Sequence, residues 1–265
     1  YDVEIDEIDV CPVQIQGPLS EDLMAKLAGE ELREIPYYGL METKIGGADC
    51  VISQTGFTGE KGYEIYVRDA HENAEKMWNA VLEAGEEFGL MVIAPAHHRR
   101  IAAGILSWGQ DLDHETSPFQ VNLSYQVPRN KEADYIGKEA LEKQRAIIDE
   151  GNAPFKMKMV GLIFGGKEIT DYAPDFWLIN DTDGNEMGFI TSPWWSPELN
   201  TNIALGWVPW NSSEIGTQLQ VMLPDEYADS SGAPVDGEIV DIPFRESVNP
   251  NKREVQKAKG LDFAD

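Results

Sequence analysis

The sequence predicts an α+β protein in two parts: mixed strands and helices over residues 1–152, and an all-β barrel or sandwich over residues 153–250. Three observations lead to this division. Short runs with alternating apolar and polar residues near the start of the chain are typical of strands, and apolar residues at helical spacing lie between them. After Phe155, short strand-like runs follow at fairly regular intervals with turn signals between them. The last residues, 251–265, have the composition of a loose charged tail.

The composition narrows the range of partners. The 265 residues include 47 acidic and 21 basic ones, for a formal charge of −26. Such a surface repels phosphate backbones and anionic lipid, so we expect neither nucleic acid nor a membrane as a partner. Cys11 and Cys50 lie far apart in the sequence, and no signal peptide or long apolar run is seen. We therefore expect a cytoplasmic monomer or homodimer with reduced, unreactive thiols.

The first elements follow from local patterns. Residues 3–16 alternate as strand material, and the segment GPLSEDLMAKLAG then predicts a helix with Ser20 as its N-cap and Gly29 as its stop. Its single glycine does not make a phosphate-binding loop. The chain opens on Tyr1 rather than Met, which suggests a fragment or a processed start.

Strands are predicted over residues 37–67, with a Gly-Gly hairpin turn at 46–47. A helix follows, for which Asp69 and Glu72 have the spacing of a capping box. The apolar spacing of this helix predicts that Trp78 belongs to the core rather than to a stacking platform.

A third helix is predicted over residues 96–104, where His97, His98, Arg99 and Arg100 follow one another. Adjacent histidines point about 100° apart on a helix, so they cannot jointly chelate a metal, and we expect no metal site. The two arginines fit either a solvated surface or a grip on a carboxylate in a cleft. Further along, Asp111 and Asp113 are interpreted as turn caps.

The most informative stretch is TGFTGEKGYEIYV, residues 55–67. Its glycines predict turns that lead into a short strand. Because strand side chains alternate, Glu64 and Tyr66 share one face, while Ile65 and Val67 share the other and can face the core. An acid with aromatic neighbours on one strand face is a plausible floor for a flat, nitrogen-rich ligand.

An ordered set of motifs resembles one family, the folate-dependent aminomethyltransferases, which include the T-protein of the glycine cleavage system. The motifs are IQGP at 15–18, TGFTGEKGYEI at 55–65, GQDLD at 109–113, SPF at 117–119, YIGKEAL at 135–141, SPELNTNIALGWV at 196–208 and DIPF at 241–244. The resemblance implies a folate-binding α/β domain followed by a C-terminal β-barrel domain. It also implies tetrahydrofolate as the acceptor of a one-carbon unit from a small methylated donor.

The resemblance assigns roles to individual residues. Glu64 stands where the family's acid grips the pterin ring, and a carboxylate can accept two hydrogen bonds from the amidine-like edge of a pterin. The candidate cofactor-binding residues are Glu64, Tyr66, Phe57, Tyr63, Tyr37, Tyr38 and Arg100. Trp194 and Trp195 are candidates for residues that line the entrance of the substrate site. The alternative is that they belong to the barrel core.

Two departures from the family pattern matter. The family's front section, which holds the aspartate nearest the reacting carbon, has no counterpart here, so we expect the catalytic acid upstream of Tyr1. In APAHHRRIAAG, Ala96 and Ala102 replace an arginine and a glutamate of the T-proteins. This difference, with the continuation RIAAGILSWG, favours the dimethylsulfoniopropionate demethylase-like branch.

The leading hypothesis is therefore a tetrahydrofolate-dependent methyl or aminomethyl transferase of the demethylase-like kind. The alternatives are a glycine cleavage T-protein, a non-catalytic folate-binding protein, and the folate domain of a dimethylglycine or sarcosine oxidase. The motif K-G-C-Y-x-G, which marks non-catalytic folate-binding relatives, is absent from the sequence.

Overall fold

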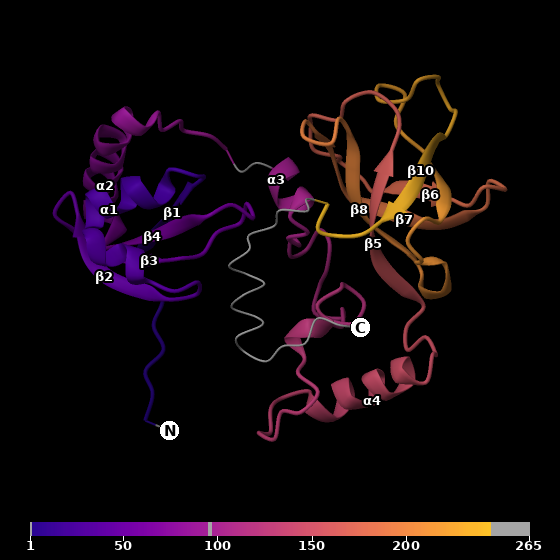
Figure 1. Cartoon of the computed structure of the whole chain (residues 1–265), viewed down its shortest axis with the longest axis horizontal. Coiled ribbons are helices and arrows are strands. Elements are labelled where there is room, and N and C mark those ends of the chain that lie inside the picture. Colours follow the sequence, from indigo (N-terminus) through magenta and orange to yellow (C-terminus); the bar gives the residue numbers. More distant parts are fainter. Residues whose placement is uncertain (1, 95–96, 245–265) are drawn as a thin grey trace. The chain divides into compact units, whose positions relative to one another are not determined.

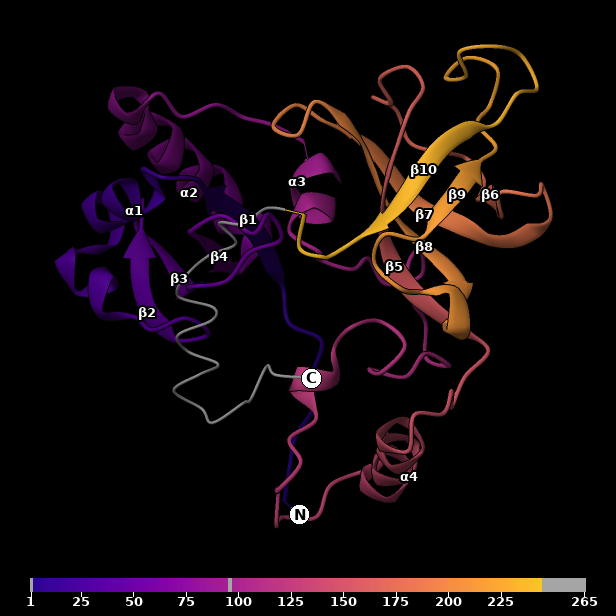
Figure 2. The ribbon, with the colours of Figure 1, turned by 45° about the vertical axis from the view of Figure 1, so that its right-hand side comes forward.

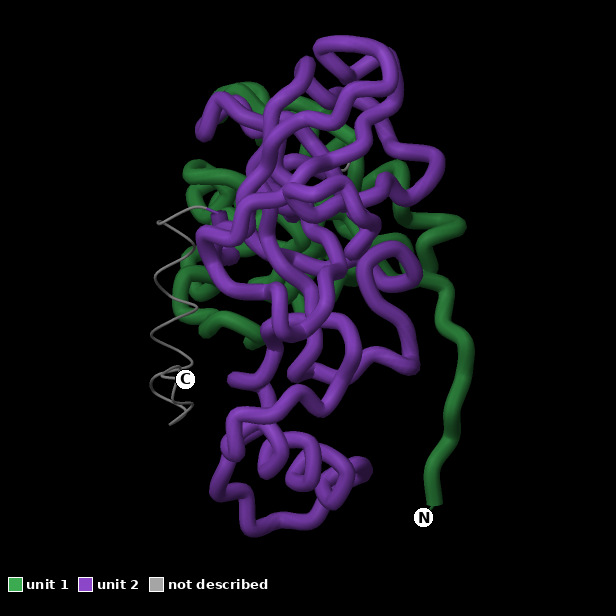
Figure 3. Tube along the Cα trace, turned by 90° about the vertical axis from the view of Figure 1, so that its right-hand side faces the viewer, with its two compact units in different colours: residues 1–96, 248–255 green, residues 97–247, 256–265 purple. Residues whose placement is uncertain are grey.

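The computed structural model describes residues 2–94 and 97–244, and the chain divides into two compact units (Figure 3). The described part of the first unit is residues 2–94, and that of the second is residues 97–244. Residues 97–152 are therefore grouped with the barrel, although the sequence places the domain boundary at 152/153. The predicted tail, residues 251–265, lies outside the described residues.

The first unit contains one antiparallel sheet with strand order β1-β4-β3-β2 (Figure 1). Its strands are β1 (Val10–Gln16), β2 (Leu40–Ile45), β3 (Ala48–Ser53) and β4 (Gly62–Arg68). Its helical elements are α1 (Ser20–Ala28), η1 (Glu30–Glu34), α2 (Ala70–Gly85) and η2 (Glu86–Phe88). The predicted first strand is too long, because residues 2–9 carry no regular element.

One face of this sheet is the core face. Ile52 and Ile65 are fully buried in one cluster with Met24 of α1 and Met77 of α2, so both helices cover the same face. The prediction for Trp78 is wrong, because its side chain is half-buried and outside this cluster. The opposite face carries exposed or half-buried side chains, and this is the face that bears the candidate site.

The predicted stop at Gly29 is confirmed, whereas the predicted caps at Ser20 and Asp69 are wrong. Gly29 ends α1 with φ 105°. Ser20 lies inside the first turn of α1, and its hydroxyl donates to the carbonyl of Lys61 at 2.9 Å. Asp69 precedes α2 in a left-handed conformation without a side-chain cap, and the carboxylate of Asp9 accepts from the His71 amide at 3.0 Å instead. A partner distant in sequence therefore replaces the local capping box.

The second unit is built on a closed antiparallel barrel with strand order β10-β5-β8-β7-β6-β9 (Figure 2). The strands are β5 (Met157–Phe164), β6 (Trp177–Asn180), β7 (Glu186–Ser196), β8 (Thr201–Pro209), β9 (Gln218–Val221) and β10 (Val235–Val240). The helical elements are α3 (His97–Ala102), η3 (Ser124–Gln126), α4 (Lys138–Asp149) and η4 (Trp210–Ser212). Each strand-like run predicted after Phe155 overlaps a barrel strand, although the last one, EIVDIPF, continues four residues past the end of β10. Of the two predicted forms, the barrel is correct.

Strand β8 is buried on both faces, which explains its continuous apolar run. Ala204 and Val208 belong to the barrel interior, while Leu205 on the other face belongs to a second cluster with Ile101 and Ala102 of α3. Helix α3 is thereby fixed to the outside of the barrel. Among the helices of the described ranges, none has the length and apolar character to cross a membrane.

Candidate functional site

The alternation predicted for strand β4 is confirmed. Ile65 and Val67 are fully buried, and Glu64 and Tyr66 are half-buried on the open sheet face. The register places Glu64 between Gln14 of β1 and Ser53 of β3. The sheet therefore presents one carboxylate in the middle of a polar row.

Three side chains donate hydrogen bonds to the Glu64 carboxylate. Gln14 Nε2 donates to Oε1 at 3.1 Å, and the hydroxyls of Thr55 and Tyr66 both donate to Oε2, the latter at 3.3 Å. The Ser53 hydroxyl lies 2.6 Å from that of Thr55. A carboxylate has about four acceptor positions, so Oε1 keeps one for a ligand. The sequence analysis expects the carboxylate to accept two hydrogen bonds from a pterin, and the second of these would require one of the three donors to move away.

Burial is the main reason that the pKa of Tyr66 is raised, and the negative charge of Glu64 adds to it. The phenol therefore remains protonated at neutral pH and can act as a hydrogen-bond donor. Its ring and the Glu64 carboxylate together combine an aromatic surface with an acceptor, which is the combination that a flat heterocycle with N–H groups needs.

The loop before β4 is held by Gln16, a residue of the IQGP motif. Its Nε2 donates to the Thr55 carbonyl at 3.3 Å, and its Oε1 accepts from Thr58 Oγ1 at 2.7 Å. A Cβ added at Gly56 or Gly62 would lie within 2.5 Å of this side chain. A side chain at Gly56 would have to displace the Gln16 amide, and one at Gly62 would also meet the Ile15 carbonyl at 2.6 Å, so Gln16 links two sequence motifs in one structural unit.

The other aromatic candidates of the first unit differ in position. Tyr63 is fully buried on the core face, opposite to Glu64, so its predicted role in cofactor binding does not fit the structure. Phe57 is 39% exposed at the tip of the glycine loop. Tyr37 and Tyr38 contact each other with ring centroids 4.2 Å apart, and Tyr38 is 61% exposed.

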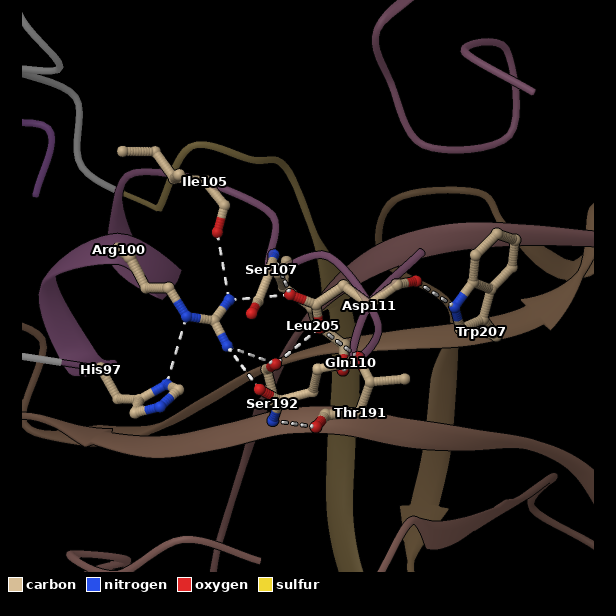
Figure 4. A network of polar contacts seen from close by, with 10 residues as sticks. All are labelled: His97, Arg100, Ile105, Ser107, Gln110, Asp111, Thr191, Ser192, Leu205 and Trp207. Atoms are coloured by element: carbon tan, nitrogen blue, oxygen red, sulfur yellow. Dashed lines mark hydrogen bonds and ion pairs between the residues drawn. The ribbon is translucent and has the colours of Figure 1, made fainter. Parts of the chain in front are cut away.

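Arg100 also does not fit the predicted role, because its side chain is 2% exposed and all five of its N–H groups donate within the second unit (Figure 4). The acceptors are His97 Nδ1, the Ile105 carbonyl, Asp111 Oδ2, Gln110 Oε1 and Ser192 Oγ. No donor is left for a ligand. The arginine does hold a carboxylate, as one sequence hypothesis allowed, but that carboxylate belongs to the protein.

Asp111 is not simply a turn cap, since its carboxylate has no exposed surface and pairs with Arg100 at 2.8 Å. Its Oδ1 accepts from Thr191 and Ser192 at 2.6 and 2.5 Å. Its Oδ2 also accepts from the Ser107 amide at 2.8 Å. All of its acceptor positions are occupied, so this buried pair is a closed structural network. Asp113 does act as a turn cap, accepting from the Glu115 amide at 2.9 Å.

His97 lies in an aromatic contact group. Its ring stacks on Trp194 with centroids 5.4 Å apart and meets Tyr172 edge-on at 4.0 Å. Burial, helped by the positive charge of Arg100, lowers the pKa of His97 to about 4, against a smaller opposite effect of Asp111. The imidazole is therefore neutral at neutral pH.

Trp194 and Trp195, the candidate substrate residues, lie half-buried near the end of β7 in the second unit. Trp194 is packed against His97 and Tyr172, and the Trp195 amide donates to the Ile169 carbonyl at 2.8 Å. Their substrate role stays a prediction. Within the described ranges, no group of three or more His, Cys, Asp or Glu side chains is arranged to hold a metal ion.

Gln14, Ser53 and Thr55 were not identified from the sequence, although each contributes to the polar cluster around Glu64. Thr55 is the first residue of the glycine-rich motif that contains Glu64, and this position could have suggested that the two side chains are close. Gln14 and Ser53 become visible only with the strand register, because local alternation does not tell which strands are neighbours.

Comparison with known proteins gives two matches in chain order. Residues 2–131 match the GCVT N-terminal domain, and residues 156–244 match the glycine cleavage T-protein C-terminal barrel domain. The dimethylsulfoniopropionate demethylase DmdA of Ruegeria pomeroyi is 34% identical over 225 residues, which are 85% of this chain and 58% of that protein.

An aminomethyltransferase of Clostridium botulinum is 35% identical over 226 residues, which are 83% of this chain and 58% of that protein. The glycine cleavage system aminomethyltransferase T of Bartonella henselae has the same fold, with a TM-score of 0.67 at 22% identity over 89% of this chain and 60% of that one. The chain thus spans about 58% of the length of these curated relatives. Two matched domains in the family's order, together with relatives about one third identical, show that the chain belongs to the glycine cleavage T-protein family of aminomethyltransferases.

Proposed function

We propose that this chain binds tetrahydrofolate through Glu64 and that the whole protein transfers a one-carbon group from a small methylated donor to it. The observation that carries the proposal is the Glu64 carboxylate, which is held by three donors on the open face of the sheet and keeps an acceptor position on Oε1. The pterin ring of the folate offers N–H donors and a flat face. Tyr66 supplies a ring and a protonated hydroxyl beside the carboxylate.

The roles of the remaining candidates follow from their placement. Phe57, Tyr37 and Tyr38 are proposed to contact the folate, since they are half-buried or exposed in the same unit as Glu64. We leave out Tyr63, which is in the core, and Arg100, whose donors are used. The chemical step needs little from these residues, because the reactive carbon is activated on the donor and the protein mainly positions the reactants.

A binding experiment tests the proposal on this chain. Tetrahydrofolate should raise the melting temperature, and Glu64→Gln should strongly reduce this rise, because the neutral amide oxygen that remains is a weaker acceptor than a carboxylate oxygen. Glu42→Gln is the matched control, since Glu42 is an exposed acid of the same sheet that pairs only with Arg68 in the described ranges. An unmoved melting curve at millimolar tetrahydrofolate would contradict the proposal.

We propose a demethylase-like donor, a small methylated cation of the dimethylsulfoniopropionate type, as the first choice. The support is the sequence RIAAGILS and the buried position of Ala102, which is 2% exposed in an apolar cluster where T-proteins carry a glutamate. The other substitution, at Ala96, lies outside the described residues. The DmdA and aminomethyltransferase relatives are about equally similar, so identity does not favour either donor.

The donor is tested on the full-length protein with tetrahydrofolate and a panel of a sulfonium, dimethylglycine and aminomethyl-lipoyl carrier. Loss of a methyl group from a sulfonium leaves a neutral thioether, and the folate nitrogen that gains the methyl releases its proton. Methyltetrahydrofolate with a thioether product is the expected result. Methylenetetrahydrofolate with ammonia from the lipoyl carrier would instead identify a glycine cleavage activity.

A further inference from the structure

The Glu64 carboxylate is fixed by a chain of two hydroxyl groups. Thr55 Oγ1 donates its proton to Glu64 Oε2, and Ser53 Oγ lies 2.6 Å from Thr55 Oγ1. A hydroxyl has a single proton, so the proton in the Ser53–Thr55 contact comes from Ser53. The order of donation is therefore Ser53 to Thr55 to Glu64.

The protein sets the place of Thr55 without help from a ligand. Its carbonyl accepts from Gln16 Nε2 at 3.3 Å, and Ser53 stands directly opposite Glu64 in the register of β3 and β4. The donor, two residues past the end of β3, is thus tied to Gln16 of β1, and the acceptor lies on β4 of the same sheet. A preorganised donor costs little conformational entropy when the ligand arrives.

The two carboxylate oxygens differ as a consequence. Oε2 receives two donors, Thr55 and Tyr66, whereas Oε1 receives only Gln14, which is exposed. The free acceptor position therefore lies on Oε1. Without the Thr55 bond, the carboxylate could rotate and offer either oxygen.

We propose that Thr55 is a positioning residue, which orients Glu64 so that Oε1 faces an N–H donor of the ligand. This inference rests on the proposed function, because it concerns how Glu64 would hold the folate. The hydroxyl of Thr55, and not its methyl group, carries this role.

A pair of substitutions separates the hydroxyl from the shape of the side chain. Thr55→Val keeps the shape and removes the donor, and Thr55→Ser keeps the donor and removes the methyl group. Tetrahydrofolate affinity, measured by calorimetry on this chain, should fall by up to about tenfold in the valine variant, since ordering a released side chain on binding costs about that factor. The serine variant should bind within about threefold of the wild type, which corresponds to less than one hydrogen bond to a charged group.

Ser53→Ala should lower the affinity less than Thr55→Val, because Ser53 acts through Thr55. Urea unfolding of each variant without folate shows whether the fold is retained. Equal affinities of the valine, serine and wild-type proteins would overturn the positioning role, as would equal losses in the two Thr55 variants. If the wild type itself binds no tetrahydrofolate, the proposed function fails. If the wild type binds and the valine variant binds equally well, only the positioning role of Thr55 fails.

Discussion

Replacing Asp111 by asparagine should destabilise the second unit strongly, because the Arg100 charge would stay buried without its counterion. The two side chains are 2% and 0% exposed, and their closest atoms are 2.8 Å apart. Removing one partner of a buried ion pair costs about 3–5 kcal/mol of unfolding free energy. For a unit of this size that corresponds to a fall in melting temperature of roughly 6–20 °C.

The hydrogen bonds predict how the asparagine would sit. Arg100 and the Ser107 amide can only donate to Oδ2, whereas the hydroxyls of Thr191 and Ser192 can rotate and accept. The new NH₂ group should therefore face the two hydroxyls. The main loss is then electrostatic, and the size of the predicted effect depends on charge rather than on shape.

Tryptophan fluorescence during urea unfolding is a suitable assay, since six of the seven tryptophans lie between residues 97 and 244. One of them, Trp207, donates its indole N–H to the Asp111 carbonyl at 3.0 Å. The control is the double variant Arg100→Met with Asp111→Leu, which should cost less than the sum of its single variants. A loss below about 1 kcal/mol in the asparagine variant would refute the reasoning, because such a value is typical of an exposed pair.

Two further predictions concern pH and packing. His97→Gln keeps an acceptor for Arg100 but does not titrate. Because the pKa of His97 is lowered from 6.5 to about 4, the unfolded state binds more protons in this range, and wild-type stability falls as the pH drops from 6.5 to 4. The shift corresponds to about 3 kcal/mol of unfolding free energy at most, and solvent screening of a half-buried ring reduces this to about 1–2 kcal/mol. In parallel urea titrations, His97→Gln should therefore lose about 1–2 kcal/mol less unfolding free energy than the wild type as the pH drops. Identical pH profiles of stability would contradict this prediction. Gly62→Ala would place a Cβ 2.4 Å from the Gln16 side chain and 2.6 Å from the Ile15 backbone carbonyl, which cannot move aside, and should cost about 1–3 kcal/mol. The control is Gly165→Ala, where the nearest atom is 3.8 Å away and little change in stability is expected. Equal effects of the two substitutions would contradict the steric argument.

Local patterns predicted the parts of the fold that depend on neighbouring residues. The alternation of β4 and the Gly-Gly turn are such cases, because both follow from backbone geometry within a few residues. The turn residues Gly46 and Gly47 have φ of 59° and 82°, as a tight hairpin between β2 and β3 requires. The barrel strands were also found, since regular turn signals separate them.

Capping and pairing were less predictable, because they depend on residues far apart in the sequence. The capping box at Asp69 has the right spacing, but Asp9 lies close enough to take its place. Arg100 and Asp111 are only eleven positions apart, yet Ser192 on β7 is needed to complete their network. A single sequence contains no sign that these groups meet, so the sequence alone predicts Arg100 as a ligand-binding residue.

The carboxylates of Asp111 and Glu64 show that the number of hydrogen bonds an acid accepts from its own protein can distinguish a structural acid from a ligand-binding one. Asp111 and Glu64 both stand in family motifs, and both accept bonds from hydroxyl groups. Asp111 is paired with Arg100 and has every acceptor position filled, so a ligand could not reach it without breaking the core. Glu64 has three donors, lacks a positively charged partner among the described residues, and keeps a position on a half-buried oxygen. Because an acid that is incompletely satisfied by its own protein gains most from a ligand donor, Glu64 rather than Asp111 is where a folate should bind.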